Sequence, residues 1–187
     1  MRNMVSAVLV LVFGLSIWGG TARSADVAEL LERAKKGEPE AQYGLAERYR
    51  KGDGVPKNVE EAEQWYRKAG ENGSAEAQYT LGKIYRKGEG VPQNDAEAAK
   101  WYRKAAEQGV PAAQADLGLM YANGQGVRRD YVESVKWYRK AAEQGNASAQ
   151  HGLGIMYHNG FGVERDDGEG NKWFRKAAEQ GYYGKSQ

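Results

Sequence analysis

Four tryptophans recur at a constant interval in this chain. Trp65, Trp101, Trp137 and Trp173 stand 36 residues apart, and the residues around them keep the same phase without insertion or deletion. A period of about 20 to 50 residues is typical of stacked structural repeats, in which each unit packs only on its neighbours. Such an array presents a long surface and rarely a catalytic cleft, so the sequence predicts binding before catalysis.

Each copy predicts a pair of helices. In the copy of residues 74–109, apolar residues recur at helical spacing and predict a first helix over about 75–87. Gly88 is expected to end this helix, because glycine adopts the left-handed conformation that other residues resist. Asn94 then begins a second helix, with Glu97 three residues on to complete a reciprocal capping box. The corresponding pairs in the other copies are Asn58 and Glu61, Asp130 and Glu133, and Asp166 and Glu169.

Two runs of the second copy carry a family resemblance. The first helix and its loop read Ala77-Gln78-Tyr79-x-Leu81-Gly82-x-x-Tyr85-x-x-Gly88-x-Gly90-Val91, and the second helix reads Trp101-Tyr102-x-Lys104-Ala105-Ala106-Glu107-Gln108-Gly109. These runs closely resemble the Sel1-like repeat, a relative of the tetratricopeptide repeat. The resemblance covers residues 38–181 in four consecutive units, 38–73, 74–109, 110–145 and 146–181.

The resemblance implies both a fold and a role. The fold is all-α, a right-handed α/α-solenoid of four 36-residue helix–turn–helix repeats. Residues 26–37 are interpreted as an N-terminal capping helix, because Leu30 has the phase of Tyr102 and Gly37 that of Gly109. Proteins of this class serve as scaffolds for protein–protein contacts, often in bacterial envelopes. Residues 182–187 form a C-terminal tail, which is expected to blunt the apolar edge of the last repeat unless a partner uses that edge.

The fourth copy departs from the pattern at two positions. Gly168 and Gly170 stand where the second copy has Ala96 and Ala98. Because each glycine costs a helix interior about 1 kcal/mol relative to alanine, the start of this helix is expected to fray.

The first 25 residues are typical of an export signal. Arg2 provides a positive start, residues 4–18 are uncharged and mostly apolar, and small residues follow from Gly19. Cleavage after Ala22 or after Ser24 fits this pattern, and a retained membrane anchor is the alternative. The apolar run is shorter than the roughly 20 residues that span a bilayer, which favours cleavage. We therefore expect an exported protein, with no stable membrane insertion once the signal is removed. Together with the bacterial envelopes that the resemblance implies, this predicts a periplasmic or secreted bacterial protein.

The mature chain is expected to be electrically neutral. The whole sequence has 27 basic and 25 acidic residues, and Arg2 and Arg23 of the leader account for the excess. A neutral chain has no overall field that would recruit nucleic acid or an anionic membrane. Cysteine is absent, which excludes disulfides and thiolate metal sites, so the repeats must be held together by their own core.

Positions that differ between copies at a fixed phase are free to serve binding. On the first helix of each copy, the positions equivalent to residues 43, 47 and 50 lie about 180° from the buried face, and the position equivalent to residue 51 flanks them. The resemblance implies that this face lines a concave groove. Its residues are Tyr43, Glu47, Arg50 and Lys51; Tyr79, Lys83, Arg86 and Lys87; Ala115, Leu119, Ala122 and Asn123; and His151, Ile155, His158 and Asn159. The first half is basic with two tyrosines, and the second half is largely apolar or uncharged.

From this stripe we predict a protein-binding surface. Leu119 and Ile155 are its informative members, because apolar patches exposed on soluble proteins often mark contact sites. The alternative is that the basic residues are ordinary surface residues and that the two aliphatic side chains pack against neighbouring helices. The predicted binding residues are Tyr43, Arg50, Lys51, Tyr79, Lys83, Arg86, Lys87, Leu119, Ile155 and His158.

The sequence lacks a catalytic or metal-binding set of residues. His151 and His158 are the only histidines, and on one helix their backbones are about 10 Å apart, too far for easy shared chelation. No serine begins the Ser-x-x-Lys sequence of penicillin-reactive nucleophiles. The glycine loops do not complete a phosphate-binding motif, and the run from Asp166 to Asn171 lacks carboxylates at two positions of a calcium loop. We therefore expect no enzymatic activity, no cofactor and no metal.

These observations favour one function and leave others open. The leading function is a periplasmic or secreted adaptor whose groove holds an extended or helical segment of a cell-envelope protein. A secreted factor that engages a host protein would use the same surface. An enzyme acting on cell-wall material or a β-lactam is a third alternative, which the lack of a nucleophile and base disfavours.

Overall fold

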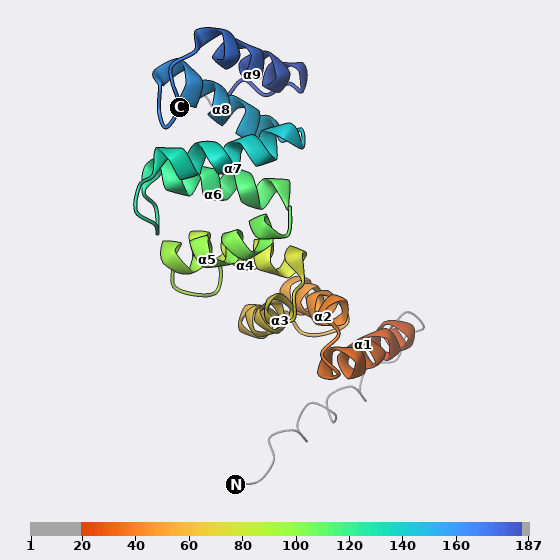
Figure 1. Ribbon diagram of the computed structural model, residues 1–187. Helices are drawn as coiled ribbons and strands as arrows, with labels where there is room; N and C mark the ends of the chain where they lie inside the picture. The colour runs from red at the N-terminus through yellow and green to blue at the C-terminus, as the bar shows by residue number, and fades with distance from the viewer. Residues whose placement is uncertain (1–19, 185–187) are drawn as a thin grey trace. The chain divides into compact units, whose positions relative to one another are not determined.

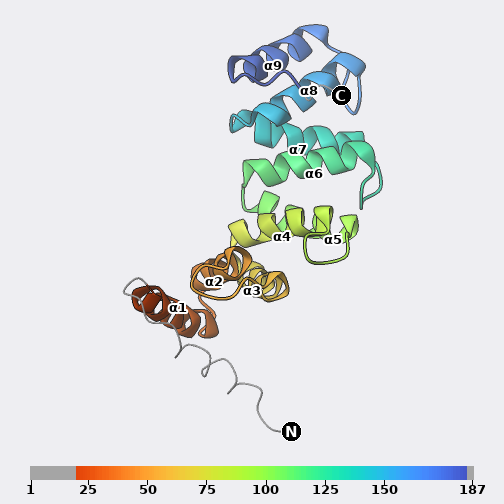
Figure 2. The ribbon, with the colours of Figure 1, turned by 180° about the vertical axis from the view of Figure 1, so that it is seen from behind.

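The computed structural model describes residues 20–184 (Figures 1 and 2). The chain divides into two compact units. Unit 1 ends at Ser74, and unit 2 begins at Ala75. Unit 1 contains α1 (Gly20–Lys35), α2 (Pro39–Lys51) and α3 (Val59–Glu71). Unit 2 contains α4 (Ala75–Lys87), α5 (Asp95–Glu107), α6 (Pro111–Asn123), α7 (Tyr131–Glu143), α8 (Ala147–Asn159) and α9 (Asp167–Glu179).

Residues 20–184 hold nine helices and no strand, so the predicted all-α solenoid fold is confirmed. Most of the predicted signal, residues 1–19, lies outside the described residues, as does the end of the tail, residues 185–187.

The helices of each unit pack in the order of the chain. In unit 2, α4 packs on α5, α5 on α6, and so on to α9, with a smaller contact between α6 and α8 (Figure 1). In unit 1, α2 packs against both α1 and α3. Packing between sequence neighbours is what stacked helix pairs produce, because each pair buries its apolar face on the next.

Glycines on the first helices let aromatic rings from the second helices approach the backbone. A Cβ atom at Gly118 would lie 2.9 Å from the ring of Tyr138, and one at Gly154 would lie 2.7 Å from the ring of Phe174. Of the repeated tryptophans, Trp101, Trp137 and Trp173 belong to the core, at 5–6% exposure, while Trp65 is half-buried.

The predicted capping box forms only in part. Asn94 accepts a hydrogen bond from the amide of Glu97 (3.0 Å), as expected of a helix-capping residue. The reciprocal bond of a capping box would run from the amide of Asn94 to the side chain of Glu97. Instead, the amide of Asn94 donates to the carbonyl oxygen of Tyr85 in the preceding helix (2.8 Å). The amides of Asn58, Asp130 and Asp166 donate in the same way to the carbonyls of Tyr49, Tyr121 and Tyr157. Each capping residue therefore ties the second helix to the end of the first.

The expected fraying of the last helix is not observed. α9 begins at Asp167, directly after its capping residue Asp166, as the other second helices do. Gly170 is buried, and a Cβ atom there would lie 3.2 Å from the carbonyl oxygen of Gly154. The glycine therefore permits a close approach of α9 to α8, and this contact offsets its low helix propensity.

Buried glutamines connect successive helices. Gln114 donates to the carbonyl oxygen of Ala106 (3.1 Å) and accepts from the side chain of Gln144 (2.7 Å). Gln150 bonds in the same way to Ala142 and Gln180, and in unit 1 Gln42 bonds to Ala34 and Asn72. These amide pairs fix the register between neighbouring helices, because a buried amide left without partners would cost free energy.

Candidate protein-binding surface

The first helices of unit 2 line two adjoining cavities, which we call together the groove. Both cavities are lined by Arg86 of α4 and Asp116 of α6. The polar cavity, of about 300 Å³, is lined by Tyr79, Lys83, Arg86, Lys87, Tyr102 and Asp116. The second cavity, of about 250 Å³, is lined by Arg86, Ala115, Asp116, Leu119, Tyr138, Ser148, His151, Gly152, Ile155 and Tyr182. We call it the apolar cavity after its aliphatic and aromatic side chains, although polar groups form about half of its lining.

An ion pair lies on the wall that the two cavities share. Nη1 of Arg86 is 3.1 Å from Oδ1 of Asp116. Burial raises the pKa of the Asp116 carboxyl, and the positive charge of Arg86 opposes that rise. Burial, together with the negative charge of Asp116, raises the pKa of Tyr79 to about 12, so this phenol stays protonated and neutral at physiological pH.

Lys83 and Lys87 differ in how far they are engaged. Lys87 pairs with Glu89 at 3.2 Å. Lys83 lies with its Nζ atom 5.5 Å from the centroid of the Tyr79 ring, and it makes no ion pair within residues 20–184. Lys83 is therefore the cation of the polar cavity that no carboxylate holds at ion-pair distance, although its charge also helps to offset the burial of Asp116.

The apolar cavity contains one exposed aliphatic side chain and one that is half-buried. Ile155 is 39% exposed, as predicted for a contact residue. Leu119 is only partly exposed and packs against the core around Tyr138 and Met156. The prediction that both side chains lie on a solvent-facing surface is therefore only half right, because α7 and α8 pack close enough to α6 to cover part of Leu119.

His151 lies in an aromatic setting within the apolar cavity. Its ring centroid is 5.2 Å from that of Phe174 and 5.6 Å from that of Tyr182. Burial lowers the pKa of His151, so the imidazole is neutral near pH 7. This cavity therefore offers apolar and aromatic contacts without a formal charge from the histidine.

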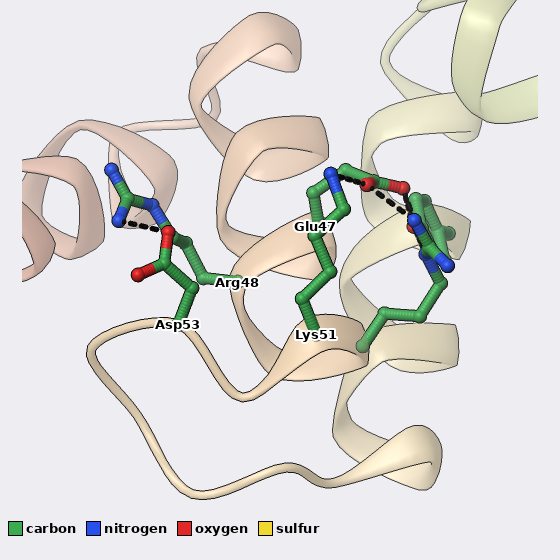
Figure 3. Close-up of polar contacts among 6 residues, drawn as sticks. Glu47, Arg48, Lys51 and Asp53 are labelled. Atoms are coloured by element: carbon green, nitrogen blue, oxygen red, sulfur yellow. Dashed lines mark hydrogen bonds and ion pairs between the residues drawn. The ribbon is translucent and has the colours of Figure 1, made fainter.

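The predicted basic residues of unit 1 are largely neutralised. Arg50 and Lys51 each lie 2.7 Å from Oε2 of Glu47, and the hydroxyl of Tyr66 donates to the same carboxylate (Figure 3). The hydrogen bond from Arg50 is the main cause that lowers the pKa of Glu47 to about 2. The predicted member Tyr43 lies against Tyr66, with ring centroids 5.6 Å apart. The sequence analysis assigned Arg50 and Lys51 to the binding surface and overlooked that Glu47, on the same helix, forms ion pairs with both.

The structure thus places the ten predicted binding residues in different settings. Tyr43, Arg50 and Lys51 belong to unit 1. Around the groove of unit 2 it brings together Tyr79, Lys83, Arg86, Lys87, Leu119 and Ile155. His158 instead pairs with Asp167 at the start of α9, with 3.0 Å between Nδ1 and Oδ1.

Sequence reasoning missed Asp116, although a signal was present. The other copies carry Gly44, Thr80 and Gly152 at this phase, and Asp116 is the only charged residue of α6. An acid that appears in a single copy, beside the variable stripe, marks a position that the fold does not require.

Two features are absent from the part of the chain that the structure describes. Among the described residues, no group of three or more histidine, aspartate or glutamate side chains is placed to hold a metal ion. A search of the same part of the chain finds no helix with the length and apolar character needed to cross a membrane.

Comparison with known proteins identifies the repeat. The Sel1 repeat family model matches residues 39–74, 75–110, 111–146 and 147–182. No curated protein matches the chain. Among solved structures, a protective antigen present in uropathogenic Escherichia coli strains, which displays an SLR fold, is 48% identical with a TM-score of 0.77. The match covers 83% of this chain and 33% of that protein.

Two further structures show the same fold. A Sel1 repeat protein from Oxalobacter formigenes is 37% identical with a TM-score of 0.73, over 84% of this chain and 63% of that one. The cysteine-rich protein B of Helicobacter pylori shares the fold at 24% identity and a TM-score of 0.53, over 70% of this chain and 97% of that one. This chain therefore spans about a third of the length of the Escherichia coli protein and under two thirds of the length of the Oxalobacter formigenes protein. With all four repeats matched by the family model, the chain belongs to the Sel1 repeat family.

Proposed function

We propose that this protein is an exported adaptor that holds a segment of a partner protein in the groove of unit 2. Sel1 repeat proteins are generally non-catalytic scaffolds for protein–protein contacts. The observation that supports the groove as the contact site is the pair of adjoining cavities, with the unpaired Lys83 in one and the exposed Ile155 in the other.

The polar cavity favours an acidic partner segment. Lys83, Arg86 and Lys87 line it together with Asp116, and Glu89 pairs with Lys87 beside it. One positive charge is left over, although the protein as a whole is close to neutral. Exposed charges act mainly on the rate of encounter, and at about 0.1 M salt their reach is limited to about 10 Å. A partner carrying aspartate or glutamate would therefore associate faster, and this advantage would shrink as salt is added.

The apolar cavity favours a long-lived complex. Ile155 is exposed in the free protein, and Leu119 and His151 extend the same surface. Apolar side chains that lose water on binding act mainly on the dissociation rate, because their contacts must break before the partner leaves.

The test begins with the partner and then separates the two cavities. Proteins captured from a cell-envelope fraction are identified by mass spectrometry, and the association and dissociation rates of the purified partner are measured. We expect Lys83→Ser to slow association several-fold and to weaken its salt dependence. We expect Ile155→Ser to speed dissociation by roughly tenfold, as the loss of an apolar anchor does.

Matched controls lie outside the groove. Lys100 is exposed on α5, where it pairs with Glu97 at 2.6 Å, and Val132 is 64% exposed at the start of α7. Lys100→Ser and Val132→Ser should leave both rates unchanged. Equal effects of the groove and control variants, with all four proteins folded by circular dichroism, would show that the partner binds elsewhere.

A second candidate destination rests on the relative from Escherichia coli. That protein is described as a protective antigen, and its match to this chain is 48% identical. A secreted factor that engages a host protein would use the same groove, with a host protein as partner. Immunodetection in periplasmic and culture-supernatant fractions distinguishes the two destinations, since a factor that acts on the host must reach the supernatant.

A further inference from the structure

The chain turns back onto α8 after its last helix. The amide of Tyr182 donates to the carbonyl oxygen of Ala177 (3.0 Å), which repeats the exit seen at Val110 and Asn146 after the earlier second helices. The ring of Tyr182 then meets the ring of His151 edge-on, with 5.6 Å between centroids and an interplanar angle of 67°. The backbone at Gly184 passes against the same imidazole, since a Cβ atom there would lie 2.8 Å from Nε2 of His151.

Two adjacent tyrosines of the tail have opposite environments. Tyr182 is half-buried and forms part of the wall of the apolar cavity, together with Ile155 and Tyr138. Tyr183 is 79% exposed. The place against the imidazole of His151, at the edge of the cavity, is therefore taken by one particular aromatic side chain of the protein itself. The adjacent tyrosine serves as an internal comparison.

We propose that the apolar cavity is a receptor for an aromatic side chain of the partner segment, and that Tyr182 is its intramolecular competitor. This inference rests on the proposed function and names the residue type that the groove selects. Aromatic rings gain from edge-to-face contact beyond the burial of their area, and His151 presents its ring for such a contact. An aliphatic side chain of similar size would fill the cavity but would lose this contact.

The arrangement of the two cavities adds a requirement for charge. The apolar cavity, whose wall includes Tyr182, shares Arg86 and Asp116 with the polar cavity, where Lys83 is unpaired. A segment that places an aromatic ring against His151 and continues toward α4 brings its neighbouring residues to Lys83. The preferred ligand is therefore a peptide with an aromatic residue and an acidic residue close to it.

Because a partner must first displace Tyr182, its apparent affinity for the groove is lower than it would be without this side chain. A tethered side chain competes at a high effective concentration, because it cannot diffuse away. The apparent affinity of the partner falls in proportion to the fraction of molecules in which the place against His151 is free. Removal of the tyrosine ring should therefore strengthen binding, which is the opposite of what a partner-contacting residue would do.

The test uses a defined set of probes. Short synthetic Gly/Ser peptides each carry one central tyrosine, phenylalanine or leucine, with or without one aspartate at varied spacing. Their affinity is measured for the full chain, for Tyr182→Ser and for the matched control Tyr183→Ser. We expect the aromatic peptides to bind more tightly than the leucine peptides. We also expect Tyr182→Ser to bind them roughly three- to tenfold more tightly than the full chain, and Tyr183→Ser to leave the affinity unchanged.

The outcomes separate this inference from the proposed function. Equal binding of aromatic and leucine peptides, weakened by Ile155→Ser, would overturn the aromatic preference while the groove remained the binding site. Weaker or unchanged binding by Tyr182→Ser would overturn the competition by the tail. Failure of every peptide to bind any of the three proteins, all folded by circular dichroism, would overturn the inference and count against the groove itself.

Discussion

Two carboxylates, those of Glu47 and Asp116, pair with basic residues of the first helices and reduce the positive charge that these residues offer to a partner. Glu47 lies three and four residues before Arg50 and Lys51, so this pairing was within reach of the sequence, because such positions are neighbours on a helix. Asp116 lies 30 residues from Arg86, and their contact depends on how α4 and α6 are placed within unit 2. No local spacing rule could have predicted the second pair.

At the residue scale, Glu47 should govern the acid stability of the first repeat. Its pKa is lowered from 4.5 to about 2, so its carboxylate stabilises the folded state above about pH 4.5, and this contribution is lost as the pH falls toward 2. The shift corresponds to at most about 3 kcal/mol near pH 7, less the effect of solvent screening. We expect Glu47→Gln to be less stable than the original protein near neutral pH, by urea unfolding.

The pH dependence tests the cause of that loss. The difference between Glu47→Gln and the original protein should narrow between pH 4.5 and pH 2, where the original carboxylate becomes protonated. Glu71→Gln, at the exposed end of α3, serves as the control and should track the original protein. A difference that stays constant with pH would show that Glu47 acts through packing and not through its charge.

At the scale of the helix, the repeat period made most boundaries predictable. The predicted first helix over about 75–87 matches α4, and it ends at Gly88, whose φ of 71° lies in the left-handed region. The start of α9 was not predictable from helix propensity, because Gly170 contributes through the approach of the Gly154 backbone. The second half of the capping box failed for a similar reason, since the loop carries the amide of Asn94 to Tyr85 instead of to Glu97.

The position of a helix in the array should decide the cost of losing its tryptophan. Trp101 and Trp173 are similarly buried, at 5% and 6% exposure. However, α5 packs against both α4 and α6, whereas the main neighbour of α9 among the described helices is α8. Trp101→Ala should therefore lower the free energy of unfolding by about 3–5 kcal/mol through the cavity that it leaves.

Trp173→Ala should cost less in the same denaturant melts. The terminal helix can detach locally, so the loss is limited by the free energy that couples α9 to α8. Hydrogen exchange should show faster exchange confined to α8 and α9. Equal losses for the two variants, spread over all helices of unit 2, would instead mean that unit 2 unfolds as a single cooperative block.

At the scale of the whole molecule, the fold was predictable while much of the site was not. The glycines that end the first helices, the residues that cap the second helices and the buried apolar positions all recur four times. A helix boundary that is ambiguous in one copy can therefore be assigned from the other three. The site depends on residues that occur once, such as Asp116 and Tyr182, and a repeat pattern carries no information about these. Their roles follow only from the packing of α4, α6 and α8 and from the path of the tail.

Export is the prediction that concerns the chain as a whole. Cleavage after Ala22 or Ser24 would shorten α1, but Val27, Leu30, Leu31 and Ala34, which pack in the core of unit 1, lie beyond both sites. The protein isolated from cells should therefore begin at Arg23 or Ala25 and should melt like the uncleaved chain. N-terminal sequencing together with thermal unfolding checks both points, and an intact Met1 in the cell-derived protein would contradict the export proposal.

The buried glutamine pairs have a consequence for how such proteins evolve. Each glutamine on a first helix bonds only to the end of the second helix of its own repeat and to the helix just before it. Gln114, for example, bonds to Gln144 and to Ala106. Duplication or deletion of one complete 36-residue unit would recreate the same bonds at the new junction. An insertion of any other length within the helices would leave buried amides without partners. The chain length of related proteins is therefore expected to change by complete 36-residue repeats, and each change would add or remove the part of the binding surface that one repeat provides.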